Sequence, residues 1–130
     1  MGLQVTDPDG RVLQQIAPKP ARRIDIPAAE LQAIRDGLRA AAQQPGGTSY
    51  DIFGTFPKPV YGKTGTAQTP RGDQSWYVAY VPDPVRPIVV AATVESGGFG
   101  AEAAGPAVRL ILSQWFGVRK EIISGTSRTR

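Results

Sequence analysis

The stretch VYGKTGTAQ, residues 60–68, places an ammonium, hydroxyls and bare backbone together in a segment that otherwise reads as a β-strand. Lys63 and Thr64, side by side on an exposed strand, can hold a carboxylate through charge-assisted hydrogen bonds. Gly65 lets a ligand lie against the backbone and pair as an added strand. The backbone N–H of Thr66 can then point at a developing oxyanion. These groups can bind a peptide that ends in a free carboxylate, but they include no nucleophile.

The same residues also fit a purely structural interpretation. A lysine on an edge strand discourages unwanted sheet pairing, and threonine is common in strands. Gly62 and Gly65 can each mark a β-bulge. Because three residues recur often by chance, KTG alone leaves the structural and the functional interpretations open.

The elements that must position this strand begin with a hairpin and a helix. Leu3–Thr6 and Arg11–Ile16 flank the turn sequence DPDG, which predicts a β-hairpin. Residues 26–47 predict a helix that ends at Pro45-Gly46-Gly47, followed by a loop over residues 48–58. The apolar face of this helix consists of Leu31, Ile34, Leu38 and Ala42.

Three strands are predicted next, over Val60–Gln68, Ser75–Val81 and Pro87–Glu95. Their short polar or proline-rich joints favour an antiparallel meander. The nearly unbroken apolar run IVVAATV predicts a central strand covered on both faces. A second helix follows and stops at Gly117. Its expected core face consists of Val108, Ile111, Leu112 and Trp115. The expected class is therefore α+β, an antiparallel sheet with packing helices.

Composition removes several kinds of site. The 130 residues contain no cysteine and no histidine, so a Ser-His-Asp triad, a Cys-His pair and a histidine or thiolate metal site cannot form within them. We expect neither a metal nor a cofactor. The net charge of +4 comes mostly from a basic tail, residues 119–130, which we expect to be disordered. Since no aromatic residues interleave with these charges, we expect no nucleic-acid partner.

Taken in order, the strings YGKTGTAQ, DQSWYVAYVPD and PIVVAATVESGGFG with AAGPAVRLIL closely resemble the C-terminal part of the transpeptidase domain of class B penicillin-binding proteins. The DPDGRV hairpin and the segment PGGTSY match the same family. The ESGG turn is most similar to the elongation-type subgroup, penicillin-binding protein 2. The resemblance covers the chain from about Leu3 to Phe116.

The resemblance implies the fold shared by penicillin-binding proteins and serine β-lactamases, and the cross-linking of peptidoglycan stem peptides by a serine D,D-transpeptidase. In that family, SxxK carries the nucleophile and SxN helps to move protons. The KTG motif corresponds here to Lys63, Thr64 and Gly65. By this likeness, Lys63 and Thr64 hold the carboxylate of a D-Ala-D-Ala stem peptide or a β-lactam. Thr66 contributes its backbone N–H to the oxyanion hole and binds substrate, and Trp76 packs on the neighbouring strand.

Two of the three family motifs are missing from this sequence. None of its six serines is followed three residues later by lysine, and it contains no asparagine. We therefore expect residues 1–118 to be the C-terminal portion of a transpeptidase domain that is inactive alone. Its expected partners are stem peptides, β-lactams and the N-terminal half of the domain, or a second copy of itself when isolated. Two alternatives are a non-catalytic peptide-binding or scaffold module and a fragment of a class D β-lactamase.

No window of the sequence reaches the roughly 20 apolar residues that cross a bilayer. For the full-length protein, the resemblance implies a place at the extracytoplasmic face of the cell membrane, with an anchor outside these residues.

Overall fold

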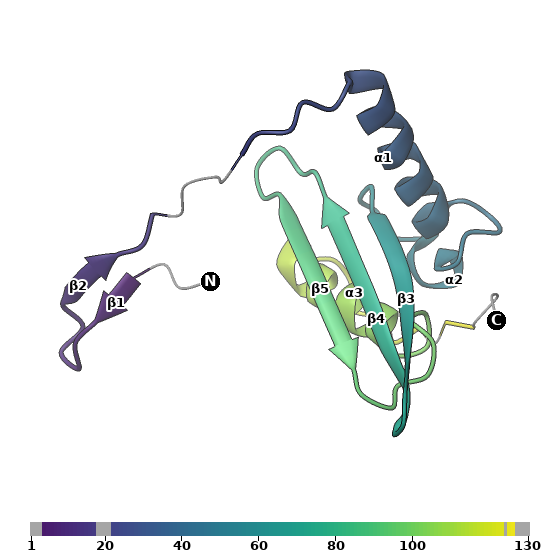
Figure 1. Cartoon of the computed structure of the whole chain (residues 1–130). Coiled ribbons are helices and arrows are strands. Elements are labelled where there is room, and N and C mark those ends of the chain that lie inside the picture. The colour runs from purple at the N-terminus through teal and green to yellow at the C-terminus, as the bar shows by residue number, and fades with distance from the viewer. Residues whose placement is uncertain (1–3, 18–21, 124, 127–130) are drawn as a thin grey trace.

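A computed structural model describes residues 4–17, 22–123 and 125–126. The chain begins with the predicted hairpin, in which β1 (Gln4–Thr6) pairs antiparallel with β2 (Val12–Gln15). The carboxylate of Asp7 accepts hydrogen bonds from the backbone N–H groups of Asp9 and Arg11, which closes the turn. Every residue of both strands is exposed, and the hairpin lies apart from the main sheet (Figure 1).

The first helix, α1 (Ala28–Gln43), follows Pro27 and ends at Gln44. Its predicted core face packs only in part, since Ala42 is buried while Ile34 is 55% exposed. Figure 1 shows why: α1 meets the sheet beside β3 through its C-terminal end, and its N-terminal turns extend beyond it. Ile34 therefore stays in solvent, while Leu31 and Leu38 are half-buried.

The predicted antiparallel meander is confirmed. It consists of β3 (Tyr61–Thr69), β4 (Gly72–Val81) and β5 (Ile88–Val94), in that spatial order. The joint between β3 and β4 is shorter than predicted, because Pro70 and Arg71 alone connect them.

The prediction that IVVAATV forms a central strand covered on both faces is wrong for the described residues. Among these, β4 is central and β5 lies at an edge of the sheet. Val90 is buried against the helices, but Val89 is 66% exposed on the opposite face. An apolar run indicates that a strand can be buried, but it does not determine whether other elements cover both of its faces.

The core lies on one side of the sheet. α3 (Ala104–Phe116) crosses β4 and β5, and the short helix α2 (Tyr50–Phe53) packs beside it (Figure 1). The sequence predicted only a loop where α2 lies. The buried apolar side chains on this side include Ile52, Phe53, Val60, Tyr77, Ala79, Val81, Val108 and Leu112.

The buried face of α3 differs from the predicted one. Val108 and Leu112 are buried as expected, but Ile111 and Trp115 are 46% and 44% exposed. Arg109 takes a place in the core, where its guanidinium binds the carbonyl of Ile52, pairs with Glu121 and lies over the ring of Phe56. The helix ends as predicted at Gly117, which adopts a left-handed conformation with φ of 66°.

The segment after α3 contacts the domain where the structure describes it. Besides the Glu121 pair, the Thr126 hydroxyl donates to the Asp51 carboxylate, and Gly125 is buried beside Ala101. The predicted disorder of residues 119–130 stays a prediction, and Ser124 and residues 127–130 lie outside the described residues. Within the described residues, no helix is both long enough and apolar enough to cross a membrane.

Candidate active-site strand

Strand β3 carries the KTGT residues along the edge of the sheet. Lys63 and Gly65 pair with Val78 and Trp76 of β4 and share their face. Thr64 and Thr66 pair with Tyr77 and Ser75, so their side chains point to the face that α2 and α3 cover. The first face is open, since Trp76 and Val78 are 41% and 45% exposed. The two kinds of candidate side chain therefore leave opposite faces of one edge strand.

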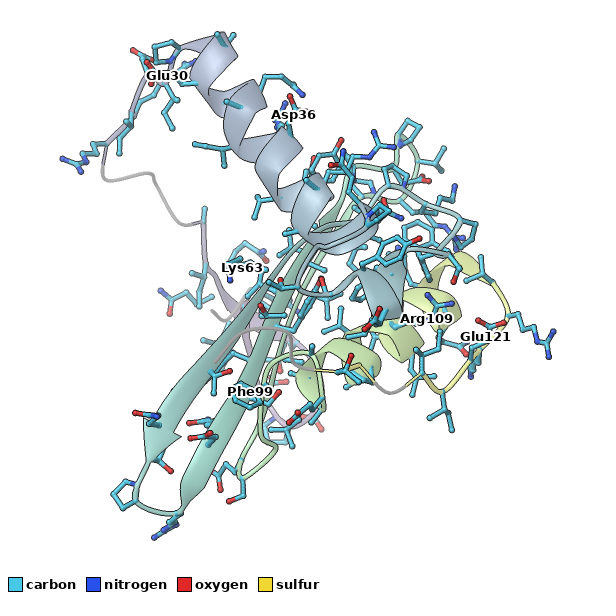
Figure 2. All side chains as sticks on the ribbon, turned by 90° about the vertical axis from the view of Figure 1, so that its right-hand side faces the viewer. Glu30, Asp36, Lys63, Phe99, Arg109 and Glu121 are labelled. Atoms are coloured by element: carbon cyan, nitrogen blue, oxygen red, sulfur yellow. The ribbon has the colours of Figure 1, made fainter. Side chains whose placement is uncertain are left out.

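The Lys63 side chain curls around the edge of β3 toward its neighbour. Its Nζ donates to the Thr64 carbonyl oxygen at 2.7 Å and lies 3.5 Å from the Thr64 Oγ1. Figure 2 shows Lys63 projecting on the opposite side of the sheet from Arg109 of α3. An ammonium and a hydroxyl thus meet at the outer edge of the strand, although their residues face opposite sides of the sheet.

Backbone groups of alternate residues also point to this edge. In an antiparallel strand, the N–H and C=O of one residue face the partner strand and those of the next face away. Since the Thr64 carbonyl receives Lys63, we infer that the backbone of Thr66 turns the same way. Its N–H then lies on the free side of β3, within two residues of the ammonium and hydroxyl.

A loop on the covered side holds Thr64. The Thr64 hydroxyl bonds the Thr48 Oγ1 at 3.2 Å. The next residue, Ser49, is 1% exposed, bonds the Ala41 carbonyl through its hydroxyl and lies 2.8 Å from the Tyr77 hydroxyl. Burial raises the pKa of Tyr77 to about 12, so its phenol stays neutral and can share this hydrogen bond throughout the physiological range.

A second loop, residues 96–103, holds Thr66. The Gly100 N–H bonds the Thr66 Oγ1 at 3.4 Å. Ser75, directly opposite Thr66 on β4, donates its hydroxyl to the Phe99 carbonyl at 2.8 Å and accepts from the Ala104 N–H at 3.0 Å. Through these two hydrogen bonds, Ser75 connects the loop and the first turn of α3 to the sheet. It does so at the position paired with Thr66, the candidate oxyanion donor.

The structure brings together all the residues that the sequence singled out, and adds three that sequence reasoning missed. These are Thr48, Ser75 and Gly100. Gly47, next to Thr48, and Gly100 itself are the only sequence signals, because glycine permits a close backbone approach. The sequence pattern assigns Gly47 to the end of the first helix and gives Gly100 no role of its own.

No described serine is placed as an activated nucleophile. The Ser49, Ser75 and Ser96 hydroxyls bond backbone carbonyls or Tyr77, and the buried Ser113 hydroxyl has no partner. Among the described residues, none of the hydrogen bonds of these four serines is to a lysine. Ser124 and Ser127 lie outside the described residues.

Comparison with known proteins decides the family. The model of the penicillin binding protein transpeptidase domain matches residues 3–113, which is most of the chain. The chain belongs to the penicillin-binding protein transpeptidase family. Among curated proteins, no match was found.

A solved structure supports the same assignment. This chain is similar to PBP2 of Pseudomonas aeruginosa, solved in complex with WCK 5153, with a TM-score of 0.69 and 28% sequence identity. The match covers 82% of this chain and 24% of the PBP2 chain, so the chain spans about a quarter of that protein. The predicted α+β transpeptidase fold and the resemblance to penicillin-binding protein 2 are thereby confirmed.

Proposed function

We propose that this chain supplies the substrate-binding strand of the active site of a serine D,D-transpeptidase, while the nucleophile comes from residues outside it. The observation that carries the proposal is the meeting of Lys63 Nζ and Thr64 Oγ1, 3.5 Å apart, at the edge of β3. A carboxylate placed there accepts a charge-assisted bond from the ammonium and a second bond from the hydroxyl.

The free edge of β3 provides the other groups that the substrate needs, namely backbone pairing partners and an oxyanion donor. A stem peptide that ends in D-Ala-D-Ala can pair with the outward backbone groups of β3 as an added strand. Gly65 carries no side chain, and its partner Trp76 lies on the open face, so the ligand approaches the backbone closely. The Thr66 N–H then donates to the oxyanion that forms when the terminal peptide bond, or a β-lactam carbonyl, is attacked.

The attacking group must be supplied by the other part of the domain. The chain has no SxxK and no SxN, and its described serines are committed to other contacts or buried. We therefore propose that the chain alone binds carboxylate ligands without turning them over. As part of a full-length protein, it would act at the extracytoplasmic face of the cell membrane.

The open face of the sheet is the proposed contact for the rest of the domain. Trp76, Val78 and Val89 form an exposed apolar patch across β4 and β5. Such a patch favours association in water, so we propose that the isolated chain can self-associate through it. The missing motifs also favour a second candidate function, a non-catalytic module that binds peptide carboxylates with the same residues.

The test of carboxylate recognition compares two ligands. A short peptide ending in D-Ala-D-Ala and its C-terminal carboxamide are titrated into the isotope-labelled chain, and amide shifts give the two dissociation constants. The acid should bind more tightly, and Lys63→Ala should reduce that preference roughly tenfold, because it removes a hydrogen bond from a charged donor. Lys120→Ala, an exposed lysine beyond α3, is the control. An unchanged preference in Lys63→Ala would refute the proposed role.

A further inference from the structure

A third polar side chain stands beside the candidate carboxylate site. The Thr48 hydroxyl lies 3.2 Å from the Thr64 Oγ1, which itself lies 3.5 Å from the Lys63 Nζ. Thr48 comes from the loop between α1 and α2 and is half-buried. Strand β3 and the loop between α1 and α2 therefore bring one ammonium and two hydroxyls into a row, in the order Lys63, Thr64 and Thr48.

The position of Thr48 is fixed on both sides along the chain. Gly47 packs so closely on the end of α1 that a Cβ there would overlap the carbonyl groups of Ala40 and Ala41. Ser49, on the other side, donates its N–H and its hydroxyl to the Ala41 carbonyl, each at 3.1 Å. The backbone on both sides of Thr48 is thus fixed against the C-terminal end of α1.

The hydrogen-bond directions in this row have a consequence for binding. A hydroxyl has one proton to donate and can accept as well. Without ligand, Thr64 donates its proton to Thr48 Oγ1. When a carboxylate accepts the Thr64 proton instead, the Thr64 oxygen is free to accept the proton of Thr48. Each donor in such a chain polarises the next, so the bond to the carboxylate is strengthened.

We propose that Thr48 is a positioning residue for carboxylate recognition: it orients the Thr64 hydroxyl toward the ligand and donates to it once the carboxylate is bound. This inference rests on the proposed function of Lys63 and Thr64. It adds to the site a residue that lies outside the KTG motif and reaches the ligand only through Thr64.

The test removes the hydroxyl of Thr48 while keeping its shape. Thr48→Val should lower the preference for the peptide acid over the carboxamide roughly fivefold, because the bond from the Thr64 hydroxyl to the carboxylate loses its support. Thr48→Ser retains a hydroxyl and should keep the preference close to that of the unaltered chain. Affinity for the carboxamide should change little in either variant, whereas a merely structural role would weaken both ligands equally.

One control and one further variant complete the test. Thr93→Val removes an exposed strand hydroxyl from β5 and should leave both affinities unchanged. Thr48→Ala is a second variant without the hydroxyl, in case the valine disturbs folding. If either folded variant keeps the full preference for the acid, Thr48 has no positioning role. If the unaltered chain shows no preference for the peptide acid over the carboxamide, the proposed function itself is wrong, whatever the role of Thr48.

Discussion

The backbone of Gly100 lies directly against the backbone of Gly65. A methyl group at Gly100 would come within 2.7 Å of the Gly65 carbonyl oxygen and 2.8 Å of its nitrogen, and it would also overlap the Trp76 carbonyl. Because real Cβ atoms do not approach backbone atoms so closely, the loop at residues 96–103 and the KTG strand fit together only with glycine there. This contact joins the candidate oxyanion strand to the loop that precedes α3.

Gly100→Ala should therefore displace β3 or the loop. We expect a loss of about 1–3 kcal/mol in the free energy of unfolding, as is typical of overpacked positions. The amide resonances of Gly65 and Thr66 should shift, and the preference for the peptide acid should weaken. Gly37→Ala is the matched control, since nothing lies within 4 Å of a Cβ there and alanine favours the exposed helix. Unmoved Gly65 and Thr66 resonances in Gly100→Ala would contradict this coupling.

Arg109 should be essential to the stability of the core. Arg109→Ala leaves the Ile52 carbonyl and Glu121 without their partner and removes the guanidinium from the Phe56 ring. We expect it to lower the free energy of unfolding by about 3 kcal/mol, measured by urea denaturation. Arg119→Ala, which changes an exposed arginine, should stay within about 0.5 kcal/mol of the unaltered chain. Equal effects of the two substitutions would contradict the role of Arg109.

Asp83 should make the folded chain sensitive to acid. A hydrogen bond from Lys58, followed by the backbone N–H groups of Arg86 and Val85, lowers the pKa of Asp83 to about 2. Because the folded state favours the ionised form, this stabilisation is present above the usual aspartate pKa of about 4 and is lost as the pH falls toward 2.

Urea unfolding at several pH values between 6 and 2 checks this prediction. Asp83→Asn should flatten the fall in stability between pH 4 and pH 2, and Lys58→Met should flatten it as well, because it removes the main donor. If stability falls as steeply between pH 4 and pH 2 in both variants as in the unaltered chain, other carboxylates cause the loss of stability in acid.

The sheet could be predicted from the sequence because its signals are local. The meander follows from apolar strands separated by short turns, and the KTG strand from its own residues. The helix α2 could not be predicted, since four residues are too few for periodicity. The buried face of α3 was misassigned because a charged residue is rarely fully buried unless it is paired. The partners of Arg109 lie far away in sequence and only the fold brings them to it.

The same reason explains which parts of the site were missed. Lys63, Thr64 and Thr66 are contiguous, so their proximity needs no fold. Thr48 and Gly100 reach β3 from 16 and 34 residues away, and nothing in the sequence gives that distance. The edge position of β5 was likewise unpredictable, because a strand's own residues do not specify its neighbours.

Covalent labelling by a β-lactam shows whether this chain can attack a substrate by itself. The 130-residue chain is incubated with a labelled penicillin, and its intact mass is compared with that of a domain in which an SxxK-bearing N-terminal half precedes it. We expect no adduct on the chain alone. The completed domain should carry one adduct, on the serine of SxxK, formed more slowly when Lys63 is changed to alanine. A stable adduct on any serine of this chain alone would show that these residues attack the substrate as well as hold it, against the proposed function.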